Sequence, residues 1–198
     1  MLKILFLFAL PIHLMVAGDF VKAQDRINPK QRYAYGCVIK NKYSVSQRLK
    51  YYPFSRAAKI LAVSFKYGPP PPDADSTAKA YEYGLHVADS VLDQRSLVEI
   101  KKLSPAQINS LTNIMYNINT RSGKGYPDTG YSCFAARNAL VFFDRNGKIF
   151  DYLEVCFECD QMRSQSDKIY FKENCLQLMD VFKQFFIDTG IQYGTIKK

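Results

Sequence analysis

The chain has 198 residues, of which 47% are hydrophobic, and its 27 Lys or Arg against 18 Asp or Glu give a net charge of +9. A chain of this length can bury the core of one domain. Its two histidines exclude a histidine-rich metal site. The lack of G-x-G-x-x-G, GKS or GKT, and G-x-S-x-G motifs excludes the usual phosphate-loop and serine-hydrolase signatures.

The N-terminal segment has the layout of a secretory signal peptide. A lysine precedes an almost unbroken apolar run, Ile4–Ala17, and small residues then allow cleavage after Gly18 or Ala23. The alternative is an uncleaved membrane anchor, but the run is shorter than the ~20 apolar residues that span a bilayer. We therefore predict a signal peptide at 1–23 and a single secreted or periplasmic domain at 24–198.

The first part of this exported domain is strongly basic. From Arg26 to Pro72 there are ten Lys or Arg residues and no acid, with six tyrosines among them. Such a segment is typical of contact with an anionic envelope component, such as lipopolysaccharide, phospholipid headgroups or an acidic polysaccharide, or with an acidic protein. Nucleic acid is disfavoured because an exported protein rarely meets it. The alternative is a solvated face whose positive charges are balanced by acidic residues further along the chain. The candidate anion-binding residues, all within 26–66, are Arg32, Lys40, Lys42, Arg48, Lys50, Arg56 and Lys59.

The remaining patterns predict an α+β fold. Four consecutive prolines make 68–76 an extended loop. Ser104 followed by Pro105 is a helix start, and Gly190 is a helix stop. The order of elements indicates an antiparallel sheet with two main helices packed on one face. The expected strands are 58–67 and 95–103, the expected helices are about 105–119 and 172–189, and a C-terminal hairpin covers about 138–158.

The hairpin sets the positions of the cysteines. Asn146-Gly147 predicts a two-residue turn in which both residues have positive φ. Pairing outward from this turn places Ala139 opposite Glu154 and brings Cys133 close to both Cys156 and Cys159. In a straight strand these last two would point to opposite faces. A disulfide from Cys133 to one of them is the most economical arrangement.

The five cysteines allow three interpretations. In an oxidising compartment structural disulfides are the default, and at least one of five thiols then stays without an intramolecular partner. A tetrahedral zinc site made of Cys133, Cys156, Cys159 and Cys175 has the right number of ligands but only one CxxC. A thiol–disulfide exchange site is disfavoured because the CxxC ends a strand among acidic residues, which raise the pKa of a thiol. Arg137 would lower that pKa.

Three features of the C-terminal half occur together: Cys133 four residues before Arg137, the hairpin, and the C-F-E-C sequence of Cys156–Cys159. In these features residues Leu92–Ile191 resemble a group of uncharacterised secreted bacterial proteins, Bacteroidetes-like in style. That group has a cysteine–x–Pro–Arg strand, whereas this chain has Ala136 in place of the proline. The resemblance implies an exported domain whose cysteines 133, 156, 159 and 175 belong together, and it brings no activity with it.

These observations favour a non-enzymatic, disulfide-stapled structural or binding protein that contacts anionic surfaces through 26–66, with no catalytic residue and no cofactor. The competing prediction is a thiol-redox or metal-binding protein, for zinc or copper, centred on the C-F-E-C motif. Its polar surroundings would be Arg137, Glu154 and Glu158.

Overall fold

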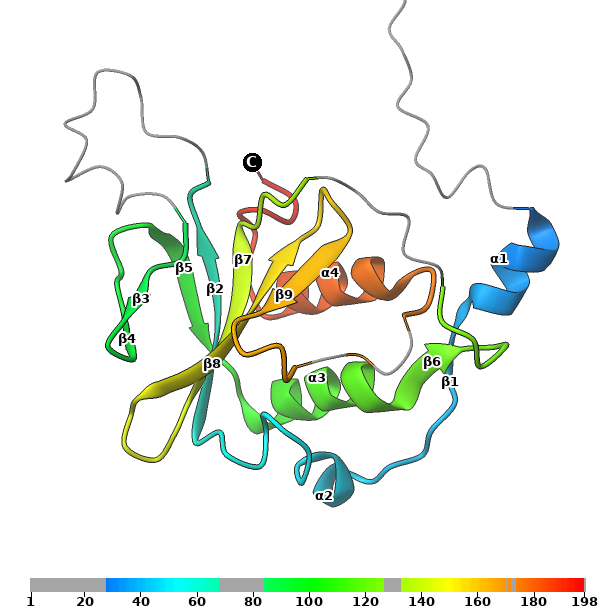
Figure 1. Cartoon of the computed structure of the whole chain (residues 1–198), viewed down its shortest axis with the longest axis horizontal. Coiled ribbons are helices and arrows are strands. Elements are labelled where there is room, and N and C mark those ends of the chain that lie inside the picture. Colours follow the sequence, from blue (N-terminus) through cyan, green and yellow to red (C-terminus); the bar gives the residue numbers. More distant parts are fainter. Residues whose placement is uncertain (1–27, 68–83, 127–132, 170, 172–173, 198) are drawn as a thin grey trace, which may run out of the picture.

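The computed structural model describes residues 28–67, 84–126, 133–169, 171 and 174–197. Its centre is an antiparallel five-stranded sheet in the order β5-β2-β7-β8-β9, accompanied by two short ribbons, β1–β6 and β3–β4 (Figure 1). The strands are β1 Cys37–Ile39, β2 Lys59–Phe65, β3 Val87–Ala88, β4 Val91–Leu92, β5 Leu97–Lys102, β6 Ile118–Thr120, β7 Asn138–Phe143, β8 Ile149–Cys156 and β9 Gln161–Ser164. The helices are α1 Pro29–Tyr35, α2 Val45–Arg48, α3 Pro105–Asn117 and α4 Leu178–Asp188. The predicted signal peptide and proline loop lie outside the described residues.

The two longer helices cover one face of the sheet, which confirms the predicted fold class. Side chains of α3 and α4, such as Leu111 and Phe186, pack on Leu140 and Phe142 of β7 and on Leu153 of β8. All five are at most 1% exposed. In the part of the chain that the structure describes, no helix is long and apolar enough to cross a bilayer.

The opposite face of the sheet is buried as well. Val63, Ala139 and Val141 form a second apolar cluster, against which Val87 of β3 and Leu92 of β4 pack. β7 is therefore buried on both faces along its whole length. This explains the apolar run that follows Asn138 along the strand.

The local signals of α3 act as the sequence predicts. Ser104 accepts a hydrogen bond from the Gln107 N–H, and the Gln107 side chain accepts one from the Ser104 N–H, so the first turn has a complete capping box. Pro105 occupies the first turn of the helix, where its missing N–H leaves no acceptor unpaired. The helix ends at Asn117, two residues before the predicted end, because the chain leaves it to form β6.

The prediction that the last helix begins near 172 is wrong. α4 begins at Leu178, and the residues just before it are bound to the N-terminal part of the chain instead. The N–H of Leu176 donates to the Tyr35 carbonyl at 2.9 Å, and Cys175 forms a disulfide with Cys37. These contacts hold 174–177 out of helical geometry. The C-terminus follows the prediction, with Gly190 at φ +87° just beyond the last turn.

The hairpin register is confirmed over most of its length. Ala139 pairs with Glu154 and Val141 with Tyr152, as expected. The turn differs, because of its two residues only Gly147 has positive φ and the loop is longer than two residues. The Asp144 carboxylate accepts hydrogen bonds from the N–H groups of residues 146 and 148, which stabilises this wider turn.

Candidate functional site

The C-F-E-C sequence forms the turn between β8 and β9. Cys156 is the last residue of β8, and β9 begins at Gln161. Asp160 has φ +49°, which reverses the chain within four residues. Because the chain turns there, the side chains of Cys156 and Cys159 both enter the apolar cluster of the second face instead of pointing apart.

The disulfides join two distant pairs of elements. Cys133 is bonded to Cys159, with their Cα atoms 5.9 Å apart, so the predicted staple at the open end of the hairpin is present. The second disulfide joins Cys37 to Cys175, with a Cα–Cα distance of 5.0 Å. The expected grouping of Cys175 with the hairpin cysteines is therefore wrong, because Cys175 lies beside β1 and not beside the β8–β9 turn.

Cys156 is the free thiol. It is 1% exposed, and its sulfur accepts a hydrogen bond from the Ala135 N–H at 3.4 Å. Thiol–disulfide exchange needs an accessible thiolate. The burial of Cys156 therefore does not favour an exchange site at this motif.

The same pairing overturns the alternative of a tetrahedral zinc site. Three of its four proposed ligands, Cys133, Cys159 and Cys175, are in disulfides, and a disulfide sulfur is not the thiolate that zinc needs. Within the described ranges, no group of three or more His, Cys, Asp or Glu side chains is placed to hold a metal ion.

The predicted polar cluster is an ion pair and a separate, half-buried carboxyl group. Arg137 bonds Glu158 at 2.9 Å, and this pairing outweighs burial, so that the pKa of the guanidinium is raised. Glu154 lies towards the end of β8, where Ala139 and Arg163 are its neighbours on the adjacent strands. Burial raises the pKa of Glu154, and the attraction of Arg163 offsets only part of this rise. The ion pair links the residue before β7 to the β8–β9 turn, whereas burial of the Glu154 charge, reflected in its raised pKa, opposes folding.

The candidate anion-binding residues lie in different surroundings. Arg48 is only 5% exposed and is part of the interior, which corrects its assignment as a surface cation. Arg56 lies 3.7 Å from Asp144, and the Lys59 ammonium lies 3.7 Å from the centre of the Phe143 ring. The remaining candidates, all of them exposed, are Arg32, Lys40, Lys42 and Lys50.

A second acid-free segment lies against the first. Between Glu99 and Asp128 the chain has no Asp or Glu. This segment contains α3 and β6, which pair with α2 and β1 of the basic segment. We define the basic surface as six of the exposed cations that these segments present, namely Lys30, Lys40, Lys42, Lys50, Arg121 and Lys124.

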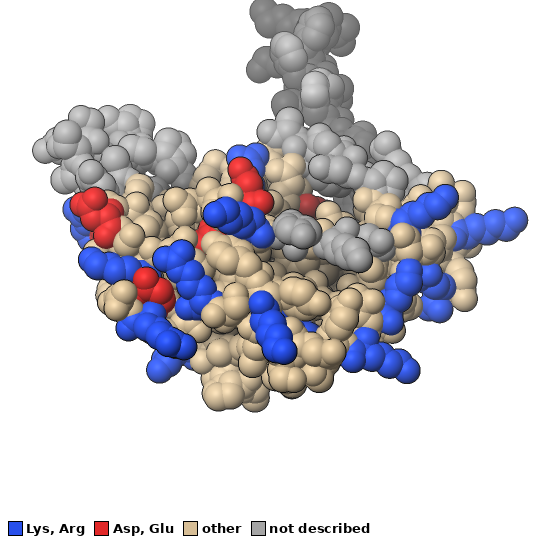
Figure 2. Space-filling model, turned by 60° about the horizontal axis from the view of Figure 1, so that its bottom comes forward, with Lys and Arg blue, Asp and Glu red and all other residues tan. Residues whose placement is uncertain are grey.

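The cations of the basic surface have no acidic partner in the described part of the chain. Over the described ranges, no Asp or Glu is at ion-pair distance from any of the six. Figure 2 shows that Lys and Arg side chains are spread over the side of the molecule facing the viewer, and that among its coloured residues the lower right part has no Asp or Glu. Among the described residues, a downstream acid balances Arg56, and none lies at ion-pair distance from these six cations.

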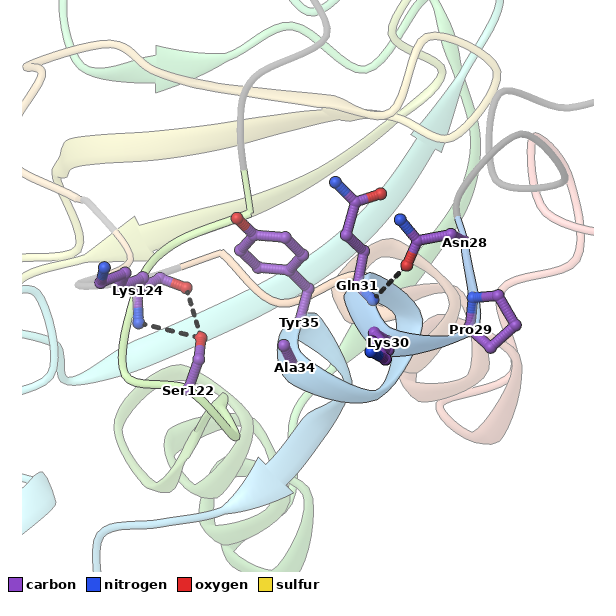
Figure 3. A pocket seen from close by; sticks show the side chains of 8 residues that line it. All are labelled: Asn28, Pro29, Lys30, Gln31, Ala34, Tyr35, Ser122 and Lys124. Carbon is purple, nitrogen blue, oxygen red and sulfur yellow. Dashed lines mark hydrogen bonds between the residues drawn. The ribbon is translucent and has the colours of Figure 1, made fainter.

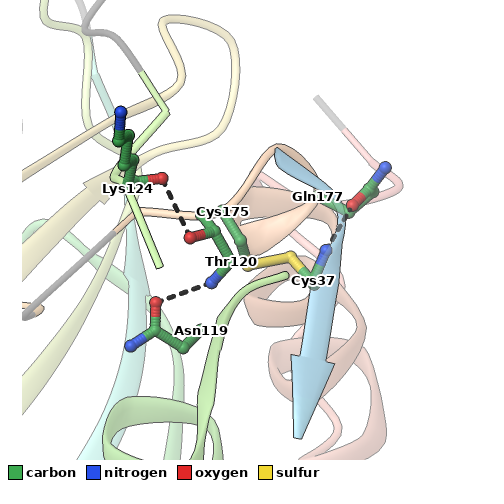
Figure 4. The surroundings of a disulfide bond; sticks show 6 residues. All are labelled: Cys37, Asn119, Thr120, Lys124, Cys175 and Gln177. Carbon is green, nitrogen blue, oxygen red and sulfur yellow. Dashed lines mark hydrogen bonds between the residues drawn. A yellow bond between two sulfur atoms is a disulfide. The ribbon is translucent and has the colours of Figure 1, made fainter. Parts of the chain in front are cut away.

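The Cys37–Cys175 disulfide fixes this end of the molecule to the helical layer (Figure 4). Beside it, the N–H of Cys37 donates to the side chain of Gln177 at 3.0 Å, and β1 pairs with β6 from Cys37 to Ile39. The Thr120 hydroxyl donates to the Lys124 carbonyl at 2.9 Å and holds the loop after β6. Lys40 and Lys124 therefore lie on backbone segments that the disulfide and these hydrogen bonds hold in place.

A cavity of about 720 Å³ opens between α1 and the loop after β6. In Figure 3, Tyr35 and Gln31 project from α1, and Lys124 lies across from them. Its accessible lining is mostly apolar, although the residues around it include two lysines, a tyrosine, two amides and a serine. The lining residues are Asn28, Pro29, Lys30, Gln31, Ala34, Tyr35, Ser122 and Lys124.

Comparisons of the chain with protein-family models, with curated proteins and with solved structures gave no match. The candidate site therefore rests on the geometry of this chain.

Sequence reasoning missed part of the basic surface. It considered only the segment before the proline loop and so left out Arg121 and Lys124. The signal was present in the sequence, since residues 100–126 contain four Lys or Arg and no acid. Only the pairing of β1 with β6 shows that the two acid-free segments form one surface.

Proposed function

We propose that the protein is an exported, disulfide-stapled α+β domain that binds an anionic partner through its basic surface and has no catalytic role. The observation that carries the proposal is the packing of two acid-free segments, α1–β1–α2 and α3–β6, against each other. Among the described residues no carboxylate lies at ion-pair distance from these cations, which leaves them able to attract an anionic ligand.

Binding of this kind depends on ionic strength. The cations are exposed, so their attraction to a polyanion is screened within about 10 Å at 0.1 M salt. Affinity for an acidic polysaccharide should therefore fall steeply as salt is added, and a neutral polysaccharide should not bind.

Charge reversal tests the assignment. Lys40→Glu combined with Lys42→Glu should weaken binding to dextran sulfate about tenfold at low salt, because each reversal removes an attraction and adds a repulsion. The affinity can be measured by titration, with neutral dextran as the reference polymer. The matched control is Arg145→Glu combined with Lys148→Glu at the tip of the β7–β8 hairpin, which changes net charge equally. Equal losses in both variants would mean that net charge alone drives binding and would defeat the proposal.

Export is the second part of the proposal. Two disulfides favour an oxidising compartment, which agrees with the signal-peptide pattern at 1–23. The intact mass of the protein released by its cell should correspond to cleavage after Gly18 or Ala23. Thiol counting under denaturing conditions should give one thiol before reduction and five after it. A full-length mass with five reduced cysteines would argue against export.

A further inference from the structure

One short stretch of the basic surface also exposes apolar side chains. Within residues 43–51, four large hydrophobic residues are exposed to solvent, and we call them the α2 patch. They are Tyr43 (36%), Val45 (42%), Leu49 (38%) and Tyr51 (43%). Four such residues within nine positions are unusual, since exposed hydrophobic residues are normally scattered singly.

The fold itself turns this patch outward. Arg48 extends from α2 into the interior, where its Nε donates to the Thr112 hydroxyl of α3 at 3.1 Å. Val45 and Leu49 are four residues apart and so share a face of the helical turn, and the rings of Tyr43 and Tyr51 lie 5.9 Å apart. With Arg48 as the anchor on one side, the patch is held in place and not merely left uncovered.

The patch is flanked by positive charge. Lys42 comes just before the patch and Lys50 lies within it, between Leu49 and Tyr51. Both are exposed, and neither has an acidic neighbour at ion-pair distance among the described residues. α2 lies at the outer edge of the molecule in Figure 1. Exposed aliphatic groups, tyrosines and lysines on a protruding turn together match the interface of an anionic bilayer, where the apolar groups enter, tyrosines lie at headgroup level and cations meet phosphates.

We infer that the α2 patch docks the protein on the surface of a membrane rich in anionic lipid. This inference rests on the proposed function and names the partner of the basic surface. A polysaccharide, which presents hydroxyl and carboxylate groups, would leave Val45 and Leu49 in contact with water. A stable protein interface buries roughly 800 Å² per partner, and four side chains that are each less than half exposed supply only part of that area.

The test uses the protein in the form that the cell releases, with vesicles of phosphatidylcholine alone or mixed with phosphatidylglycerol. The protein should co-sediment with the mixed vesicles and not with phosphatidylcholine alone. Val45→Ser combined with Leu49→Ser keeps every charge and should weaken vesicle binding about tenfold, because two apolar groups no longer leave water. Its affinity for dextran sulfate should stay unchanged.

The matched control is Val98→Ser combined with Ile100→Ser on the edge strand β5. These residues are 44% and 42% exposed, so the change is the same in chemistry and exposure but lies outside the α2 patch. If both double variants bind mixed vesicles as the unchanged protein does, or if the protein binds dextran sulfate but no vesicle, the inference fails and the proposed function stands. If the protein binds neither dextran sulfate nor mixed vesicles, the proposed function fails as well.

A spectroscopic readout reports insertion directly. The chain has no tryptophan, so Leu49→Trp introduces a single reporter. Its emission should shift to shorter wavelength on mixed vesicles and be quenched by brominated acyl chains, whereas Ile100→Trp should show neither effect. Vesicle binding with an unshifted Leu49→Trp spectrum would overturn insertion of the patch.

Discussion

Replacing Cys37 and Cys175 together by serine should lower the free energy of unfolding by about 5 kcal/mol. The disulfide joins residues 138 positions apart, and in the chain-entropy model the stabilisation grows with the logarithm of the loop that is closed. A domain of this size is stable by about 5–15 kcal/mol in total, so the variant should be close to unfolding at 37 °C. Urea denaturation followed by circular dichroism measures the change.

The matched control is Cys133→Ser combined with Cys159→Ser. Its bond spans 26 positions, for which the same model gives about 3.5 kcal/mol. The two variants should also differ in binding. Loss of the Cys37–Cys175 disulfide frees α1 and β1, so it should lower the affinity for dextran sulfate under conditions where the fold persists. Loss of the Cys133–Cys159 disulfide should leave that affinity unchanged. The opposite order of stability would show that unfolded-chain entropy does not dominate here.

Local signals in the sequence predicted much of the fold. Ser104 and Pro105 fixed the start of α3 because a helix start depends on residues within one turn. The hairpin register followed from alternation, because a slip of one residue would bring Glu154 into the face that holds Leu153 and Val155. Gly147 marked the turn correctly, but hydrogen bonds to the Asp144 side chain selected a wider loop.

Contacts between distant segments were beyond the sequence. No local pattern pairs Cys37 with Cys175, and this pair decides both the start of α4 and the position of the basic surface. Arg48 is one of a row of cations in the sequence, and only its neighbours on α3 make it an interior residue. The free thiol, Cys156, was likewise undetermined, because three hairpin cysteines allow more than one pairing.

Replacing Arg48 by alanine should lower the free energy of unfolding by about 3 kcal/mol. The guanidinium donates to the Thr112 hydroxyl, the Tyr43 carbonyl and the Asn109 side chain, and hydrogen bonds from a charged donor contribute about 1.5–3 kcal/mol each. Relief from burying a cation offsets part of this loss, which keeps the sum below three full bonds. Chemical denaturation measures it, with Lys50→Ala as the control because Lys50 is an exposed cation of the same segment.

Two further substitutions separate the contributions of packing, charge and hydrogen-bond geometry at position 48. Arg48→Met keeps the apolar stem and should recover only the packing part of the loss, and Arg48→Lys keeps the charge but lacks the planar fork that reaches three acceptors, so it should remain destabilised. Vesicle binding should fall in all three variants, although Arg48 is 5% exposed, because the α2 patch loses its anchor on α3. If Arg48→Ala instead kept full stability and lost affinity for dextran sulfate, Arg48 would act as a surface cation. The α2 patch would then owe its outward position to the Tyr43–Tyr51 contact alone.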